Sequence, residues 1–385
     1  MMDAATTSLL QRDLDAAVAK RAGRERECLQ DGTALVALKQ KGGSLGTPAA
    51  GFGGAAPKKP PTKGSAAKKK KKKAVDTTKQ LRQSSILAKE LKASGVVRID
   101  GVLSPETADA LREFVDAERA AASADVKAGT RELESRFAGL VLLENRCDLL
   151  LPLHSSPMDA VSEMLGEGSV LGNLLEEVVG RQAVFNELAC LISEPGAAQQ
   201  PIHPDTPWTL RPPLYACFVA LQDVEPDMGP TVYLPGTHTK EEHTAFYGGN
   251  LALGRDTTGA RTNAIPEAYL QSKPVKLGLL KKGDCALYNQ QVLHCGSANE
   301  SPDPARIRRQ FYISVRDPSV KGVAARASIR PALLNQLTLG DVRDAVSGKE
   351  GGDAATARAR LEELDRADAA GAGGAGAESG MDMDR

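Results

Sequence analysis

Gln199-Gln200-Pro201-Ile202-His203-Pro204-Asp205 and, 91 positions after its histidine, Leu293-His294-Cys295-Gly296 are the two stretches that decide how this chain is organised. Side chains at i and i+2 of an extended segment point to the same side, so His203 and Asp205 can converge on one ion. His294 lies in a strand-like run and joins them only if the fold brings that strand alongside. Two imidazoles and one carboxylate occupy one face of an octahedral Fe(II) and leave the other face open. We therefore predict a metal site made of His203, Asp205 and His294.

The residues around these ligands add further motifs in a fixed order. Gln200 stands three before the first histidine, and Gly283-Asp284 precedes the distal one. The remaining motifs are Ser94 to Pro105, Glu194-Pro195-Gly196, Met228-Gly229-Pro230, Leu234-Pro235-Gly236-Thr237-His238 and Asn299-Glu300-Ser301. Together, from about Leu87 to about Val315, they resemble the phytanoyl-CoA dioxygenase family of non-haem iron, 2-oxoglutarate-dependent oxygenases.

The resemblance implies both a fold and a reaction. The implied fold is mainly β with flanking helices, a double-stranded β-helix of the jelly-roll or cupin-like kind. The implied enzyme is a dioxygenase that uses Fe(II), 2-oxoglutarate and O2 to hydroxylate a small-molecule or lipid-like substrate, with release of succinate and CO2. Halogenating relatives carry a small residue in place of the ligand carboxylate, so the presence of Asp205 points to hydroxylation or another oxidation that needs no halide.

An arginine is expected to bind the far carboxylate of 2-oxoglutarate, because a guanidinium offers bidentate pairing that lysine lacks. The family places this arginine about eleven residues after the distal histidine, but position 305 is alanine here. Matching the hydrophobic strand that follows favours Arg308, and Arg306 and Arg309 remain as alternatives.

Other polar residues near these motifs are weaker candidates. Gln200, Thr231 and Trp208 are expected to line the pocket for co-substrate or substrate, although each is nearly as compatible with a scaffolding role. A turn-capping role is favoured for His238, and packing is favoured for Cys295, which alternates away from His294.

Composition divides the chain into three parts. Residues 1–84 are predicted to hold an N-terminal helix and a disordered lysine-rich tail, because Gly, Pro and Lys dominate there and cannot bury enough apolar surface. Residues 85–330 are predicted to form the dioxygenase domain. Residues 331–385 are predicted to form short helices and an Ala/Gly-rich tail that is disordered from Ala367 onward.

Local patterns predict the elements of the domain. Ser104-Pro105-Glu106 reads as an N-cap, an N1 proline and a first-turn acid of one helix, and residues 158–179 as a second helix. The predicted strands are Val184–Ser193, Leu214–Leu221, Thr231–Leu234, Asp284–Tyr288 and Gln310–Val315. The polar stretch Tyr247 to Lys273 is predicted to be a long insertion of the kind that covers sites.

Charge leaves a second class of partner open. The 49 basic and 49 acidic residues cancel, but Lys68 to Lys73 form an uninterrupted basic run. No aromatic residue is interleaved with it to stack on bases, so a solvated tail is favoured over nucleic-acid binding by about two to one. The alternative functions are accordingly a non-catalytic scaffold that keeps the fold, or a nucleic-acid-modifying oxygenase that uses this tail.

Cysteine usage and hydropathy bound the compartment. The six cysteines include no C-x-x-C pair, so no disulfide framework is predicted. The sequence also has no run of 18 apolar residues, so no membrane span is predicted. Acidic residues near the N-terminus argue against a transit peptide, so a cytoplasmic or nuclear location is predicted. The identity of the substrate and the oligomeric state are not specified by the sequence.

Overall fold

The computed structural model describes residues 77–138, 144–247, 269, 272–320, 327–347 and 352–370. The predicted helix in residues 1–27, the lysine run and nearly all of the insertion between Tyr247 and Lys273 lie outside the described residues. Helix α11 continues to Ala369, so the expected onset of disorder at Ala367 is wrong by three residues.

Two antiparallel sheets form the centre of the described chain. The larger has the strand order β1-β7-β4-β9-β3-β2, and the smaller has the order β6-β5-β8. The five predicted strands are confirmed to within two residues at each end. The strands are β1 (Val96–Ile99), β2 (Arg146–Leu150), β3 (Val184–Ser193), β4 (Leu214–Ala220), β5 (Thr231–Tyr233), β6 (Lys276–Leu277), β7 (Cys285–Asn289), β8 (His294–Gly296) and β9 (Arg308–Arg316).

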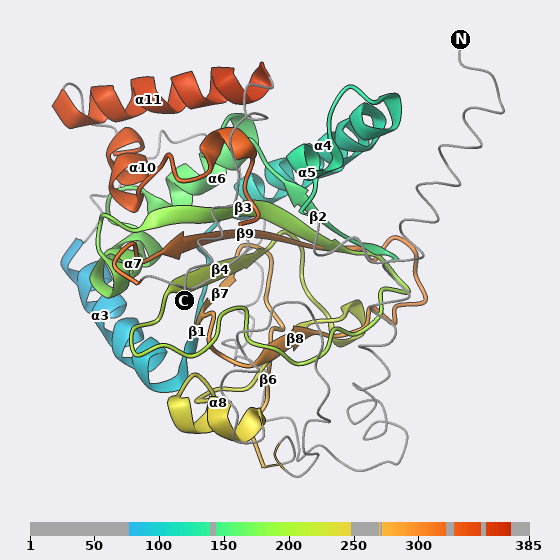
Figure 1. The fold of residues 1–385 in the computed structure, drawn as a ribbon, viewed down its shortest axis with the longest axis vertical. Coiled ribbons are helices and arrows are strands. Elements are labelled where there is room, and N and C mark those ends of the chain that lie inside the picture. The colour runs from blue at the N-terminus through green and yellow to red at the C-terminus, as the bar shows by residue number, and fades with distance from the viewer. Residues whose placement is uncertain are drawn as a thin grey trace, which may run out of the picture.

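Most of the helices cover the outer face of the large sheet, whereas the small sheet and α8 lie on its other side (Figure 1). The helices are α3 (Thr77–Ser94), α4 (Pro105–Ala128), α5 (Leu133–Arg136), α6 (Ser155–Leu165), α7 (Val170–Val179), α8 (Lys240–Phe246), α10 (Leu339–Ala345) and α11 (Gly352–Ala369). Helices hold more of the described residues than strands do. The expectation of a mainly β chain is therefore corrected to a mixed one, because the helical layer is thicker than the resemblance implied.

Strand β3 is buried on both faces. One face packs against the helices, and the other faces the interior between the two sheets. Leu188, Cys190 and Ile192 belong to the main core that packs against the helices. Ala189 and Leu191 alternate to the opposite face and pack with Tyr312 of β9 inside the protein. Burial on both faces explains why this strand reads as a continuous apolar run.

Helix termini follow the local signals, with one correction. The hydroxyl of Ser104 accepts a hydrogen bond from the Thr107 amide, so the predicted N-cap is confirmed. The single helix predicted over residues 158–179 is wrong, since α6 ends at Leu165 and α7 starts at Val170. Helix α6 is capped by Gly166, whose ψ of 173° leaves the helical region. Gly168 follows with a φ of 80°, and Ser169 caps α7.

The three-part division at residues 84 and 330 stays a prediction. Helix α3 straddles the first boundary and packs against α7, while α10 and α11 pack together. These contacts tie the described flanking helices to the same body as the sheets (Figure 1).

Gly283→Ala is expected to destabilise the fold by at least about 3 kcal/mol. A Cβ at this position would lie 2.2 Å from the Leu103 carbonyl oxygen, and the φ of 87° is unfavourable for any side chain. Gly101→Ala is the matched control, because its φ of 62° is also positive but no atom lies within 4 Å of the added carbon. The control should lose only roughly 1–2 kcal/mol. Urea unfolding of both variants measures the difference, and equal losses would contradict the role of the close contact.

Candidate metal centre

His203 and His294 are brought together by their own main chains. The amide of each residue donates a hydrogen bond to the carbonyl oxygen of the other, and both N–O distances are 2.9 Å. This antiparallel bridge joins an irregular segment to β8 and places the two ring centroids 4.8 Å apart. The 91-residue separation in sequence is therefore closed by one bridge.

Each imidazole is oriented by a carbonyl two residues before it. His203 Nδ1 lies 2.7 Å from the Pro201 oxygen, and His294 Nδ1 lies 2.9 Å from the Val292 oxygen. A carbonyl oxygen only accepts, so each Nδ1 carries the proton and each Nε2 presents a lone pair. This arrangement is how proteins orient metal-binding histidines.

Asp205 completes the group. Its Oδ1 lies 3.5 Å from His203 Nε2, its Oδ2 lies 3.4 Å from His294 Nε2, and the three ligand atoms lie within 4.8 Å of one another. Ligands held about 2.1 Å from one ion at right angles are about 3 Å apart, so a modest contraction would seat a transition metal. The predicted convergence of His203, Asp205 and His294 is present in the structure.

The protonation states also suit a cation. Burial opposes ionisation of Asp205, but the His294 and His203 rings and a hydrogen bond from Tyr288 hold the pKa of its carboxyl below its ordinary value. Burial is the main cause that lowers the pKa of His294, which favours the neutral ring. The Tyr288 hydroxyl donates to Asp205 Oδ2 at 3.1 Å, the same oxygen that lies nearest His294, and helps to orient the carboxylate.

Arg308 is fully buried on the inner face of the large sheet. It donates from Nη1 to the Gly229 carbonyl oxygen and from Nη2 to Ser193 Oγ at 3.1 Å, while its Nε has no hydrogen-bond partner in the structure. Burial, together with the neighbouring Arg146, lowers its pKa to about 9. No ion pair joins it to a carboxylate among the described residues.

The two alternative arginines are already paired with protein carboxylates. Arg306 Nη1 lies 2.9 Å from Asp227 Oδ2, and Arg309 Nε lies 2.6 Å from Asp116 Oδ1. An arginine neutralised in this way has less to offer a bound anion.

Sequence reasoning missed Arg146, the first residue of β2. Its side chain is 3% exposed and donates from Nε to the same Ser193 hydroxyl at 3.2 Å and from Nη2 to the Ala198 carbonyl oxygen at 2.8 Å. Burial lowers its pKa to about 10. The available signal was an arginine three residues before the apolar run Leu149 to Leu151.

The three weaker candidates lie in different surroundings. Gln200 Oε1 accepts a hydrogen bond from the Gly296 amide at 2.9 Å, beside β8. Thr231 is buried, and its Oγ1 lies 3.5 Å from Gln310 Oε1 on the inner face. Trp208 lies under the ammonium of Lys240 at 5.6 Å, on the α8 side.

The other residues weighed from the sequence do not join the ligand group. His238 Nε2 lies 3.2 Å from the Lys92 carbonyl oxygen in the last turn of α3, and His243 Nε2 lies 2.7 Å from the Gln291 carbonyl oxygen. Cys295 packs in an apolar cluster with Leu293.

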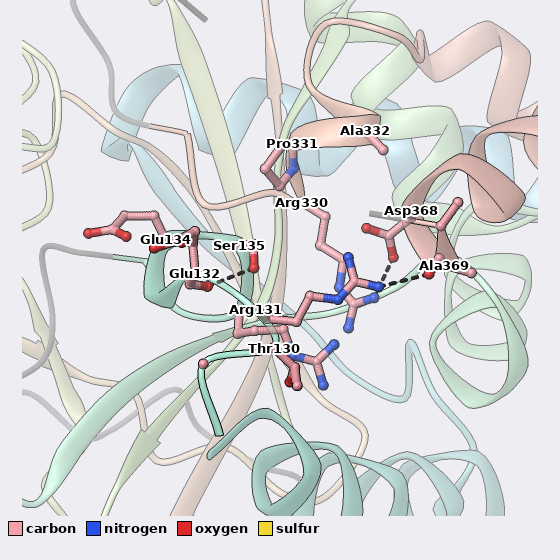
Figure 2. Close-up of a pocket in the computed structure, with 13 residues that line it drawn as sticks. Thr130, Arg131, Glu132, Glu134, Ser135, Arg330, Pro331, Ala332, Asp368 and Ala369 are labelled. Carbon is pink, nitrogen blue, oxygen red and sulfur yellow. Dashed lines mark hydrogen bonds and ion pairs between the residues drawn. The ribbon is translucent and has the colours of Figure 1, made fainter. Parts of the chain in front are cut away.

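A pocket of about 800 Å³ lies away from these ligands, between the end of α4 and the end of α11 (Figure 2). Its charged groups are largely satisfied by the protein itself. Arg330 pairs with Asp368 and Glu118, and Arg131 donates to the Ala369 carbonyl oxygen at 2.7 Å. The pocket is large, but its charged groups are largely paired within the protein, and its lining residues include no group of metal-binding side chains like His203, Asp205 and His294.

No helix among the described residues is both long and apolar enough to span a bilayer.

Comparison with known proteins identifies one family. The sequence profile of the phytanoyl-CoA dioxygenase (PhyH) family matches residues 91–308, more than half of the chain, whereas no curated protein matches it.

Several solved structures are similar to the chain at low identity. The epimerase SnoN, in complex with Fe3+, alpha ketoglutarate and nogalamycin RO, is 18% identical with a TM-score of 0.41, and the match covers 64% of this chain and 87% of that one. AviO1 from Streptomyces viridochromogenes Tue57 is 16% identical with a TM-score of 0.41, covering 65% and 99%. The alpha ketoglutarate-dependent carbocyclase SnoK is 19% identical with a TM-score of 0.39, covering 69% and 93%.

Tyr288→Phe is expected to weaken Co(II) binding by roughly tenfold, since it removes only the hydroxyl that holds Asp205. His203→Ala should weaken binding far more, because it removes a ligand atom. Tyr215→Phe is the matched control, as Tyr215 packs toward the helices. Calorimetric titration of metal-stripped protein measures all three, and a Tyr288→Phe affinity equal to that of the control would refute the role of the hydroxyl.

Proposed function

The chain belongs to the phytanoyl-CoA dioxygenase family, and from that premise we propose that it is an Fe(II)- and 2-oxoglutarate-dependent dioxygenase that hydroxylates a small-molecule or lipid-like substrate. The observation that carries the proposal is the convergence of His203, Asp205 and His294 within 4.8 Å. We also propose that the two facing sheets are the double-stranded β-helix expected for this family.

The donor set fits ferrous iron. Neutral imidazole nitrogens from His203 and His294 and a carboxylate oxygen from Asp205 would hold the ion on one side. Fe(II), when bound, supplies the redox chemistry that couples decarboxylation of 2-oxoglutarate by O2 to oxidation of the substrate. Tyr288 and the two carbonyl-bound Nδ1 protons keep the ligand atoms turned toward a common point.

We assign Arg308 to the far carboxylate of 2-oxoglutarate. It is buried and has no acidic partner among the described residues, so an incoming carboxylate would offset the cost of its desolvated charge. Arg146 shares the Ser193 hydroxyl with it and adds a second positive charge to the same region. Arg306 and Arg309 lack this property, because protein carboxylates already neutralise them.

The supporting residues have positioning roles in this proposal. Thr231 lies beside Gln310 on the inner face, and Gln310 is two residues after Arg308 in β9. Gln200 accepts a hydrogen bond from Gly296 at the end of β8, the strand that carries His294. The stacked rings of Tyr233 and His294, 6.2 Å apart, screen one side of the ligand group from water. A role for Trp208 stays a prediction.

The enzyme activity is tested by succinate release from 2-oxoglutarate with Fe(II) and O2. Wild type should release succinate above background, and His203→Ala and Asp205→Ala should lower the rate to background, because each loses a ligand. His154→Ala is the control, since His154 faces Asp365 of α11 instead. Equal rates in wild type and both ligand variants would show that the chain is not such an enzyme.

The assignment of Arg308 is tested by 2-oxoglutarate affinity. Arg308→Lys keeps the charge but loses bidentate pairing, so the Kd for 2-oxoglutarate with Ni(II) in place of iron should rise about tenfold or more. Arg306→Lys and Arg309→Lys should stay within about twofold of wild type, because their carboxylate partners lie elsewhere. A larger loss in either of these two variants would transfer the role to that arginine.

A further inference from the structure

The inner face of the large sheet carries an acidic residue that the proposed mechanism does not use. In an unbroken strand, residues two apart share a face, but the register of β3 shifts between Phe185 and Glu187. Phe185 therefore packs with the helices, while Glu187 falls in step with Ala189 and Leu191, which face the interior. The bulge aims a carboxyl group inward at one end of the strand.

Hydrogen bonds connect Glu187 to the candidate metal centre. Gln290 donates from Nε2 to Glu187 Oε2 at 2.9 Å. The main-chain oxygen of the same Gln290 accepts from the Asp205 amide at 2.9 Å. A single residue, Gln290, therefore links the carboxyl group of Glu187 to the backbone of the candidate ligand Asp205.

No positive charge in the described chain balances this acid. Neither Glu187 nor Asp148, which also lies on the inner face, takes part in an ion pair among the described residues. Asp148 is 2% exposed; its Oδ2 accepts from Tyr312 at 2.6 Å, and its Oδ1 has no hydrogen-bond partner. Burial is the main cause that raises the pKa of Glu187 to about 8, with a smaller contribution from the charges of Asp205 and Asp148. Asp148 is buried and Glu187 is partly buried, and two such acids without a countercharge are costly to ionise unless a cation joins them.

Small side chains and an aromatic surface lie on the same face as the acid. The inward residues in register across β3, β9, β4 and β7 are Glu187, Ser314, Ala216 and Tyr288, so only small side chains separate Glu187 from Tyr288. Phe218 is partly exposed on the same face, with its ring 5.5 Å from that of Tyr288 and 4.9 Å from that of Tyr312. A partly exposed ring and a carboxylate on one sheet face, two strands apart, are a combination that can bind an extended organic cation.

The interior is also polarised. Arg146 and Arg308 lie at one end of the inner face, in register with Ser193, whereas Glu187 lies at the other end of β3. The arginine end suits the dicarboxylate co-substrate, which leaves the acidic end for the molecule that is oxidised.

We propose that the substrate carries a basic group, an ammonium or a guanidinium, which Glu187 binds against the ring of Phe218 while the carbon that reacts lies toward His203, Asp205 and His294. This inference rests on the proposed function, since it names the substrate class of the same site. A protonated amine donates charge-assisted hydrogen bonds to the carboxylate and offsets its desolvation. A neutral molecule of the same shape leaves that cost in place.

The test uses the full chain loaded with Co(II) and 2-oxoglutarate without O2. The probes are matched pairs that differ only in charge: n-butylamine and n-butanol, n-hexylamine and n-hexanol, and benzylamine and benzyl alcohol. Dissociation constants come from NMR titration, and relaxation of probe protons by Co(II) reports which end of the probe lies near the metal. At least one amine should bind about tenfold more tightly than its alcohol, with the carbons farthest from nitrogen relaxed most.

Glu187→Gln should remove that preference, since it keeps the shape and a hydrogen-bond acceptor for Gln290 but loses the charge. Phe218→Leu should reduce it severalfold. Glu194→Gln is the matched control, because this acid directly follows β3 but pairs with Arg119 at 2.9 Å, and it should keep the wild-type preference.

Two results would overturn the inference: no amine preferred over its alcohol by wild type, or a preference that survives in Glu187→Gln. These results differ from failure of the proposed function. A protein that consumes 2-oxoglutarate but shows no preference for amines contradicts the substrate class alone. A protein that binds neither Co(II) nor 2-oxoglutarate contradicts the enzyme itself.

Discussion

The reciprocal pair of main-chain hydrogen bonds between residues 203 and 294 is the constraint on which the candidate centre depends. Side chains can be ligands only where the backbone delivers them, and this bridge fixes the spacing of two imidazoles before any ion is present. It uses amides and carbonyls alone, so it does not depend on which side chains occupy the two positions. Hydrogen bonds from the two imidazoles to the main-chain carbonyl oxygens of Pro201 and Val292 then set the ring orientation.

The sequence was most informative where the signal was local. A short apolar run placed β3 with both ends correct, and the Ser-Pro-Glu signal placed the start of α4, because each pattern depends on neighbours within a few residues. The spacing of His203 and Asp205 likewise reports a two-residue period of extended chain. The helix break near Gly168 was also local, but apolar residues on both sides of it masked the signal.

Features that depend on register could not be read in advance. Arg146 and Glu187 are charged residues within strands that are otherwise largely apolar, and only the strand pairing and the hydrogen bonds reveal that one lies beside Arg308 and the other beside Gln290. The choice among Arg306, Arg308 and Arg309 was similar. Arg308 and Arg309 are adjacent in β9 and point to opposite sides, and Arg306 precedes the strand. Their different partners, Asp227 and Asp116 for the outer two, become evident only from the fold.

The hydroxyl of Ser193 receives hydrogen bonds from two buried guanidinium groups, those of Arg146 and Arg308. One neutral oxygen cannot cancel two like charges enclosed in a medium of low polarity, so the folded chain carries an internal repulsion there. Any anion that reaches this point relieves the repulsion and, by mass action, makes unfolding harder. Resistance of the protein to heat and proteolysis is therefore expected to rise with the concentration of any anion that binds between these two arginines.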